Sequence, residues 1–406
     1  MLSRRFPLSL RSGAAAVSFG FASLASSAAL AVSPATPVPN THEAPPAAAS
    51  NSINAASGAT GATTQPSYGP QLEGFAYPHP QQRFRFTSQQ QTLEMAYMDV
   101  APRGTPNGRT AVLLHGKNFC GATWESTIEA LTGAGFRVIA PDQIGFCASS
   151  KPRGYQFSFQ QLAANTHALL QSLNIARATV IGHSIGGMLS LRYALQYPQD
   201  VEQLVVVNPI GLEDWQALGV PYASVDTLYQ GELKTSFESI KAYQQRFYYH
   251  GQWTPAYGRW VSMLAGLYTG PGRETFAWNQ AQTTEMMFTQ PVVHELDRIR
   301  VPTTLIIGQK DRTAPGANRA SPELQRQLGD YPVLGRRAAQ AIPGSRLVEL
   351  PERGHSPQVE APEEFNAALL QSLQAASPSQ PIRPTANDAK DASEVNDAGR
   401  ASGAKP

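Results

Sequence analysis

Short, continuous runs of hydrophobic residues recur along the chain and alternate with longer amphipathic segments. Such runs are typical of parallel strands buried on both faces, and the segments between them predict helices. Two earlier segments of alternating polarity predict a hairpin. The predicted strands cover residues 83–87, 92–100, 111–114, 137–140, 178–181, 204–207, 304–307 and 346–350. The pattern predicts an α/β fold in which helices cover both faces of a mostly parallel sheet.

Amphipathic segments beside these strands predict the main helices. They cover residues 124–132, 157–173, 188–196, 322–328 and 362–373. Right-handed crossovers place the carboxyl ends of parallel strands at one edge of the sheet, where ligands bind. Candidate chemistry is therefore expected at this edge.

The strand pattern is interrupted between about residues 210 and 294. This stretch holds four of the five tryptophans and many tyrosines and phenylalanines, and it predicts helices without core strands. One interpretation is a helical subdomain with its own aromatic core. Another is a cap over the catalytic edge that lines a pocket for an apolar or aromatic group. The sequence does not single out the pocket residues.

The N-terminus has the pattern of an export signal. Arg4 and Arg5 precede an uncharged stretch, residues 12–30, and small residues follow at Ala29 and Ala31. We predict a signal peptide over residues 1–31 and a periplasmic or secreted protein, with the export route left open. The alternative is a membrane anchor, but the stretch is only marginally apolar, which argues against a stable membrane span.

Two segments lack the hydrophobic residues that a core requires. Residues 32–70 and 377–406 are rich in small and polar residues and predict a disordered linker and tail around a folded domain at 71–376. The chain has 32 Lys and Arg against 30 Asp and Glu, and the basic residues are scattered, so no nucleic-acid partner is expected. The oligomeric state stays open.

The strongest chemical signal is the stretch from Gly182 to Gly186, which has the pattern Gly-x-Ser-x-Gly around Ser184. A strand precedes it and a helix follows, as a nucleophile elbow requires. The glycines suit a turn too tight for a Cβ atom. A glycine-rich packing turn would explain the same residues, but the strand and helix on either side favour a catalytic serine.

A serine nucleophile needs a base that an acid orients. Of the three histidines after Ser184, only His355 follows a predicted core strand; His250 and His294 lie in or beside the aromatic stretch. Asp311 follows the preceding strand and is the predicted acid. The alternative acid position, after residues 204–207, offers no carboxylate before position 213.

Acyl transfer also needs donors for a developing oxyanion. The main-chain N–H of Ile185, directly after the serine, is the first candidate. The second belongs to the loop after residues 111–114, with Lys117 preferred and Asn118 as the alternative. His115 in this loop is interpreted as structural.

These motifs together resemble the α/β-hydrolase superfamily, in its capped group with a His-Gly oxyanion loop. The likeness runs through five motifs in the expected order: Leu113 to Gly116, Pro141 to Gly145, Gly182 to Gly186, Gly308 to Asp311, and Gly354-His355. The resemblance implies an eight-stranded sheet, no cofactor, and an acyl-enzyme formed on Ser184. His355 would serve as base and then as acid, with Asp311 holding its tautomer.

Two positions depart from the family pattern. The family often has a second glycine where this chain has Cys147, and Cys120 stands in the oxyanion loop. The strands before these loops are neighbours in the family's sheet, so a disulfide bracing the oxyanion loop is our hypothesis. Two separate, buried thiols are the alternative.

Ser184 at the elbow argues against the dehalogenases and epoxide hydrolases of this fold, which use an aspartate there. The predicted function is that of an exported serine hydrolase that cleaves a small or medium, apolar or aromatic ester or lactone, with a small-molecule substrate as the partner. Carbon–carbon bond hydrolases and cofactor-free haloperoxidases are alternatives within the fold. A binding protein that has lost its chemistry is an alternative of another class. No metal-ligand cluster appears in the sequence, and we predict neither a metal nor a cofactor.

Overall fold

The computed structural model describes residues 66–375. The predicted signal peptide, most of the predicted linker and the predicted tail lie outside the described residues. Among residues 66–375, no helix combines the length and the apolar character needed to cross a bilayer. The eight strands are β1 (Gln81–Ser88), β2 (Gln91–Val100), β3 (Thr110–Leu114), β4 (Arg137–Pro141), β5 (Ala178–His183), β6 (Val201–Val207), β7 (Thr303–Gly308) and β8 (Arg346–Leu350).

These strands form a single sheet in the order β1-β2-β4-β3-β5-β6-β7-β8. β1 pairs with β2, and β2 with β4, in antiparallel register, while all later pairs are parallel. The predicted α/β fold and the mostly parallel eight-stranded sheet are therefore confirmed. Strands β3, β5, β6 and β7, at the centre, end at the same edge, as right-handed crossovers require.

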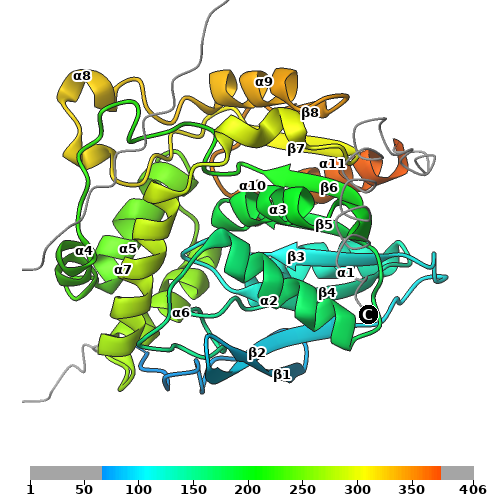
Figure 1. The fold of residues 1–406 in the computed structure, drawn as a ribbon, viewed down its shortest axis with the longest axis horizontal. Coiled ribbons are helices and arrows are strands. Elements are labelled where there is room, and N and C mark those ends of the chain that lie inside the picture. The colour runs from blue at the N-terminus through cyan, green and yellow to red at the C-terminus, as the bar shows by residue number, and fades with distance from the viewer. Residues whose placement is uncertain (1–65, 376–406) are drawn as a thin grey trace, which may run out of the picture. The chain divides into compact units, whose positions relative to one another are not determined.

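Helices cover both faces of the sheet (Figure 1). They are α1 (Glu125–Gly133), α2 (Phe159–Ser172), α3 (Ile185–Gln196), α4 (Val225–Glu232), α5 (Phe237–Tyr243), α6 (Gly258–Thr269), α7 (Arg273–Thr289), α8 (Pro322–Gln325), α9 (Tyr331–Ala341), α10 (Pro357–Glu360) and α11 (Pro362–Ala375).

Each strand side chain belongs to one of two cores because successive residues point to opposite faces. In β3, Val112 and Leu114 belong to the core that includes residues of α2, α3 and α9. Ala111 and Leu113 belong to the core that includes residues of α1 and α11. This two-sided burial explains why the central strands have continuous hydrophobic sequences.

The connection between β7 and β8 differs from the prediction of one helix at 322–328. The structure has only one turn there, α8, and the main helix is α9, eleven residues long. Gly329 ends the first segment with a φ of 70°, and Pro332 lies in the first turn of α9, where its missing N–H costs nothing. The prediction missed α9 because its sequence, rich in alanine and arginine, has only a narrow hydrophobic stripe.

Residues 66–70, which the sequence predicts as part of the linker, lie within the described part of the chain and contact α6. The main-chain N–H of Tyr68 donates a 2.9 Å hydrogen bond to the carbonyl of Gly266 in α6. A Cβ at Gly266 would lie 2.2 Å from the Tyr68 ring, so the glycine makes room for it. The ring also contacts Phe75 edge to face. Hydrogen bonds and aromatic packing together hold residues 66–70 against α6.

Between β6 and β7 lies a helical insertion, residues 208–302, which contains α4, α5, α6 and α7. Figure 1 shows these helices beyond the edge of the sheet at which β3, β5 and β6 end. Directly after α5 the chain forms a π-helical turn, Gln244–Tyr248. Such turns are rare and occur often at functional sites.

Candidate active site

Ser184 lies at the sharp turn between β5 and α3. Its φ of 57° and ψ of −119° put a residue with a side chain into a strained conformation. The turn is held because the Ser184 N–H donates to the carbonyl of Val207 at 3.1 Å. A Cβ at Gly182 would lie 2.1 Å from the carbonyl oxygen of Gly186, and one at Gly186 would lie 2.1 Å from that of Leu114. Both glycines are thus required by close backbone approach.

His355 and Asp311 form a fully buried pair. Nδ1 of His355 lies 2.7 Å from Oδ2 of Asp311, and both side chains are 0 % exposed. The other carboxylate oxygen, Oδ1, accepts the main-chain N–H of Thr313 at 2.8 Å. Because the carboxylate only accepts, Nδ1 carries a proton in this arrangement, and Nε2 is left as the acceptor of the neutral ring.

The base candidate lies beside the elbow. His183, the neighbour of Ser184, donates from Nε2 to the main-chain carbonyl of His355 at 2.8 Å, and the two rings are 4.9 Å apart. Burial lowers the pKa of His183 well below its usual value, so this ring is neutral. Nε2 of His355 is buried and has no hydrogen-bond partner among the described residues. The histidine therefore keeps a free acceptor next to the Ser184 turn.

The two other histidines after Ser184 are engaged elsewhere. His250 pairs with Glu360 at 2.8 Å, and His294 pairs with Asp214 at 2.9 Å. The His294 side chain is 63 % exposed. Neither arrangement resembles the buried pair at His355.

The loop after β3 lies against the elbow. A Cβ at Gly116 would lie 2.8 Å from Nδ1 of His183 and 3.3 Å from Cβ of Ser184. Within residues 66–375, the main-chain N–H groups of Lys117 and Asn118 donate to no backbone carbonyl. The loop that carries both oxyanion candidates, Lys117 and Asn118, is thus next to Ser184.

His115 has a structural role in the same loop. Its Nε2 accepts the main-chain N–H of Gln143 at 3.1 Å, so Nδ1 carries the proton and donates to the carbonyl of Gly116 at 2.8 Å. Burial lowers the pKa of this ring, which keeps it neutral. His115 thus joins the loop after β3 to the loop after β4.

Cys120 and Cys147 form a disulfide, which confirms the sequence hypothesis. Their Cα atoms are 5.9 Å apart, and the bond joins the loops after β3 and β4, which are neighbouring strands. Cys147 has a φ of 43°, in the left-handed region that favours glycine. This backbone conformation explains why the family often has a glycine at this position.

Within the described residues, one group of Cys, His and acidic side chains has the spacing of a metal site: Cys120, Asp142 and Cys147. Both sulfurs belong to the disulfide, so neither is a thiolate ligand. Asp142 accepts hydrogen bonds from Tyr77 at 2.5 Å and from the main-chain N–H of Gly121 at 2.7 Å. The group is fully used in holding the loops together.

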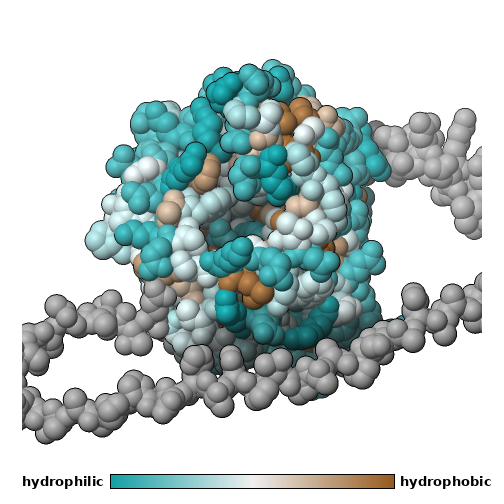
Figure 2. Space-filling model, turned by 90° about the vertical axis from the view of Figure 1, so that its left-hand side faces the viewer, coloured by the Kyte–Doolittle hydropathy of each residue, from teal (hydrophilic) through white to brown (hydrophobic). Residues whose placement is uncertain are grey.

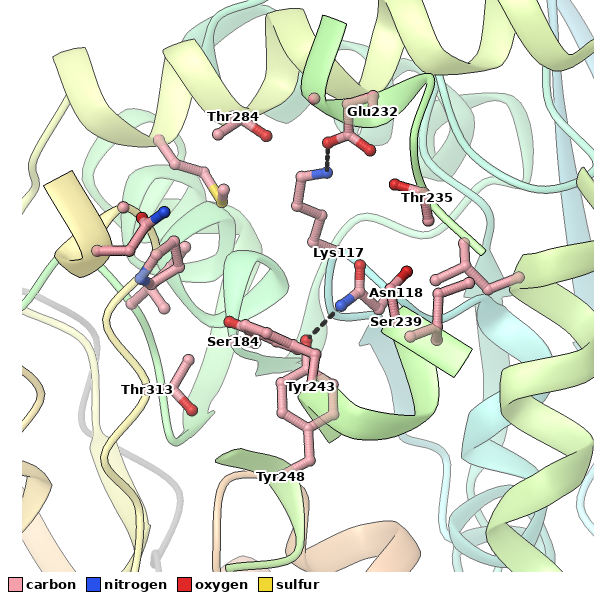
Figure 3. Close-up of a pocket in the computed structure, with 18 of the residues that line it drawn as sticks. Lys117, Asn118, Ser184, Glu232, Thr235, Ser239, Tyr243, Tyr248, Thr284 and Thr313 are labelled. Carbon is pink, nitrogen blue, oxygen red and sulfur yellow. Dashed lines mark hydrogen bonds and ion pairs between the residues drawn. The ribbon is translucent and has the colours of Figure 1, made fainter. Parts of the chain in front are cut away.

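A pocket of about 560 Å³ opens above Ser184, within the range of small-molecule sites. Its wall combines the loop after β3, residues of the helical insertion and the loop after β7. In Figure 3, Tyr243 and Tyr248 lie near Ser184, and the ion pair of Lys117 and Glu232 lies at the far end. On the face of the molecule formed by the helical insertion, hydrophobic residues occur only as small patches (Figure 2).

Tyr248 connects the helical insertion to the loops that follow β3 and β8. Its hydroxyl accepts a 3.0 Å hydrogen bond from the side-chain amide of Asn118, and its ring lies 4.9 Å from that of His355. Burial raises the pKa of Tyr248 well above its usual value, so the phenol stays protonated. A Cβ at Gly354 would lie 2.4 Å from the Tyr248 carbonyl oxygen, so the backbones also touch.

The sequence reasoning did not select Asn208, Glu232 or Tyr248. Asn208 follows β6 directly and donates a 2.7 Å hydrogen bond to Asp311, so its strand-end position was an available signal. Glu232 and Tyr248 lie in the insertion, where aromatic and amphipathic patterns are too common to mark pocket residues. Their roles depend on contacts across more than a hundred positions.

Known proteins similar to this chain agree with the geometry. The family described as alpha/beta hydrolase fold matches residues 112–362. A solved structure of a probable hydrolytic enzyme from Pseudomonas aeruginosa PAO1 is 61 % identical, has a TM-score of 0.76, and is matched over 77 % of this chain and 99 % of its own.

Two curated relatives are more distant. "Putative carbamate hydrolase RutD" from Serratia proteamaculans is 30 % identical over 68 % of this chain and 94 % of its own length. "Putative non-heme chloroperoxidase" from Synechocystis sp. is 26 % identical over 70 % of this chain and 96 % of its own. The matched family, the eight-stranded sheet and the strained turn at Ser184 lead to one conclusion: the chain belongs to the α/β-hydrolase family and is a hydrolase of this fold.

Proposed function

We propose that this hydrolase cleaves a small or medium carboxylic ester or lactone through an acyl-enzyme on Ser184. The observation that carries the proposal is the buried pair of His355 and Asp311. Nε2 of His355 has no hydrogen-bond partner among the described residues, and the histidine lies beside the elbow. A serine hydroxyl is a weak nucleophile at neutral pH, and an oriented imidazole is the usual means of activating it.

In the proposed reaction, Ser184 Oγ attacks the ester carbonyl carbon while its proton passes to Nε2 of His355. The oxygen of the tetrahedral intermediate receives hydrogen bonds from the main-chain N–H groups of Ile185 and of Lys117 or Asn118. The carbon–oxygen bond to the alcohol then breaks, and the alcohol leaves with the proton from His355. Asp311 stabilises the imidazolium without becoming protonated.

Water completes the cycle. His355 takes a proton from the water, whose oxygen attacks the acyl carbon, and then returns that proton to Ser184 Oγ as the acid leaves. One ester and one water yield one acid and one alcohol. The buried phenol of Tyr248 would exclude bulk water from the His355 side of the site.

Carbamates are a second candidate substrate class because of the name of the Serratia relative. The same serine would form a carbamoyl-enzyme, with the carbonyl carbon again as the electrophile. The pocket has polar groups, among them Lys117, Glu232 and Thr284, that suit a substrate with more than one polar atom.

The compartment is part of the proposal. A disulfide persists in oxidising surroundings, such as the periplasm or the outside of the cell, and is rare in a reducing cytosol. The Cys120–Cys147 bond and the N-terminal signal pattern together support an exported protein.

The test is hydrolysis of p-nitrophenyl esters from acetate to decanoate, together with p-nitrophenyl N-alkylcarbamates. The wild type is expected to release p-nitrophenol, and Ser184→Ala to lose at least about 10³-fold in kcat/KM. A serine-reactive phosphonate should add its mass to the wild type but not to Ser184→Ala, which keeps the pocket serine Ser239 as an internal control. Absence of both hydrolysis and labelling in the folded wild type would favour a binding protein instead.

A further inference from the structure

The pocket above Ser184 is polar at the end remote from the serine. Its sides include hydrophobic residues, among them Ile240, Leu264 and Met287. In Figure 3, the far end is formed by Lys117 and Glu232, with Thr235 and Thr284 on either side. A purely aliphatic substrate that filled the pocket would therefore bring apolar atoms against an ion pair.

The Lys117 ammonium retains one hydrogen-bond donor. It donates to Oε1 of Glu232 at 3.1 Å and to Oε1 of Gln280 at 3.0 Å. An ammonium group has three N–H donors, so one is left. The side chains of Lys117 and Glu232 are only 15 % and 18 % exposed, so solvent and salt screen them weakly.

Both carboxylate oxygens of Glu232 are already engaged within the protein. One carboxylate oxygen accepts from Lys117, and the other accepts the hydroxyl of Tyr268. Burial, together with the Glu232 charge, raises the pKa of Tyr268 well above its usual value, so this phenol stays a donor. Lys117 therefore offers a substrate a cationic donor at this end of the pocket, whereas a donor group on a substrate would have to share Glu232 with Lys117 and Tyr268.

The net charge of the residues that line the pocket is also positive. Its lining contains two lysines, Lys117 and Lys234, and one carboxylate, Glu232, which gives a net charge of +1. Lys234 has no ion-pair partner among residues 66–375. A charged cleft with low-dielectric walls concentrates ligands of opposite charge.

We infer that the substrate carries a carboxylate at the end remote from the scissile carbonyl, and that Lys117 and Lys234 select it. This inference rests on the proposed ester hydrolysis and names its substrate class: half-esters of dicarboxylic acids, or lactones and esters with a free carboxylate. An ammonium–carboxylate hydrogen bond is stronger than one to a neutral acceptor. A cationic substrate would meet the net positive charge and bind poorly.

The experiment compares substrates that differ only in this charge. One pair is the mono-4-nitrophenyl ester of hexanedioic acid and its methyl-capped diester. A second pair, 6-hydroxyhexanoic acid butyrate and its methyl ester, carries the carboxylate on the alcohol side. In at least one pair the wild type is expected to favour the carboxylate about tenfold in kcat/KM, or about 1.4 kcal/mol.

Three variants change the charge of the pocket. The carboxylate preference is the ratio of kcat/KM for the charged substrate to that for its neutral partner. Lys117→Met should bring this ratio to about 1, and Lys234→Gln should reduce it two- to threefold. Glu232→Gln removes the competing carboxylate and should raise the preference at least threefold. A ratio within one pair cancels any general loss of turnover, which matters because Lys117 is also an oxyanion candidate.

Lys241→Gln is the matched control. It removes the same charge from α5 in the helical insertion, but Lys241 lies over the Trp253 ring and outside the pocket. Its carboxylate preference should equal that of the wild type. An equal change in Lys241→Gln and Lys234→Gln would show a long-range effect of net charge and would contradict selection by the pocket.

The outcomes separate this inference from the proposed function. If the neutral esters are hydrolysed in a Ser184-dependent manner but neither pair favours the carboxylate, the inference is wrong and the proposed function stands. If no ester is hydrolysed, calorimetric binding of monomethyl hexanedioate still tests the site. Binding that weakens about tenfold in Lys117→Met supports it, and no binding to the wild type overturns it.

Discussion

The side-chain amide of Asn208 donates a 2.7 Å hydrogen bond to Oδ2 of Asp311, the oxygen that also faces His355. Oδ1 of Asn208 accepts the main-chain N–H of Gly308 at 3.0 Å, so both ends of the amide are held. Asn208 is fully buried at the end of β6, and Asp311 follows β7. The pair therefore fixes the carboxylate from the neighbouring strand.

Asn208→Leu should lower kcat about 10- to 100-fold while KM changes little. The variant leaves the buried Oδ2 with one donor fewer, and loss of a hydrogen bond to a charged group costs about 1.5–3 kcal/mol. Steady-state kinetics on a p-nitrophenyl ester measure the effect. Asn366→Leu, which removes another buried amide far from the site, is the control and should affect stability alone. An unchanged kcat in Asn208→Leu would show that the amide does not position Asp311.

The disulfide should contribute about 3 kcal/mol to the free energy of unfolding. It closes a loop spanning 27 positions. This cross-link lowers the conformational entropy of the unfolded chain, which makes unfolding less favourable. Cys120→Ala combined with Cys147→Ala should lower the urea midpoint accordingly and should also lower kcat because the oxyanion loop loses its brace. A reductant should shift the wild type in the same direction and leave the double variant unaffected. Equal urea midpoints for the oxidised wild type and the double variant would show that the disulfide does not stabilise the fold.

Lys151 lies between its own loop, which follows β4, and helix α7. Its ammonium donates to the main-chain carbonyls of Cys147 and Ser149 and lies 6.0 Å from the centre of the Phe276 ring. Burial lowers the pKa of Lys151 to about 7, although Asp142 acts in the opposite direction.

This depressed pKa makes stability depend on pH in a defined direction. Between about pH 7 and 10.5 the unfolded chain keeps the Lys151 proton and the native state loses it, so the free energy of unfolding rises with pH. Relative to Lys151→Met, the free energy of unfolding of the wild type should rise by about 2–3 kcal/mol from pH 7 to pH 9. Below pH 6 the difference between the two proteins should not change with pH. Denaturant titrations at these pH values measure the difference. Parallel curves for the two proteins would show that the ammonium is not desolvated.

Gly186→Ala should prevent correct folding of the elbow. The new methyl group would lie 2.1 Å from the carbonyl oxygen of Leu114 and 2.6 Å from that of His115, and neither backbone group can move without breaking β3. We expect a loss of more than about 3 kcal/mol or insoluble protein. Gly133→Ala in α1, where the added Cβ meets no atom within 4 Å, should keep full activity and be neutral or slightly stabilising. A soluble, active Gly186→Ala would contradict the packing argument.

The sheet could be predicted because burial on both faces leaves a continuous hydrophobic signature. Each predicted core strand lies within a few residues of its observed place, from β3 to β8. The carboxyl-end rule then placed Ser184, Asp311 and His355 at one edge, and the structure brings Asp311 and His355 into contact there. The disulfide was a hypothesis drawn from the resemblance to the family, in whose sheet these two strands are neighbours, and two separate thiols were the alternative.

The remaining features depend on contacts that leave no local pattern. The Lys117–Glu232 pair spans 115 positions and joins two short polar segments that separately resemble ordinary surface. Asn208 occupies a strand end where the acid of a triad can lie, but an asparagine there has no local pattern that predicts its hydrogen bond to Asp311. Residues 66–70 have a linker composition, and their contacts with α6 leave no local signal because the partners are far apart in the sequence: Pro66 accepts a hydrogen bond from Thr269, 203 positions later.

Tyr248 makes the helical insertion and the catalytic edge mutually dependent. The same residue meets Asn118 through its hydroxyl, His355 through its ring and Gly354 through its carbonyl group. An insertion transplanted from a relative would therefore remove the partner of one loop and the packing of the other. Changes of substrate range in this protein are expected to arise through single substitutions in the pocket wall rather than through exchange of the whole insertion.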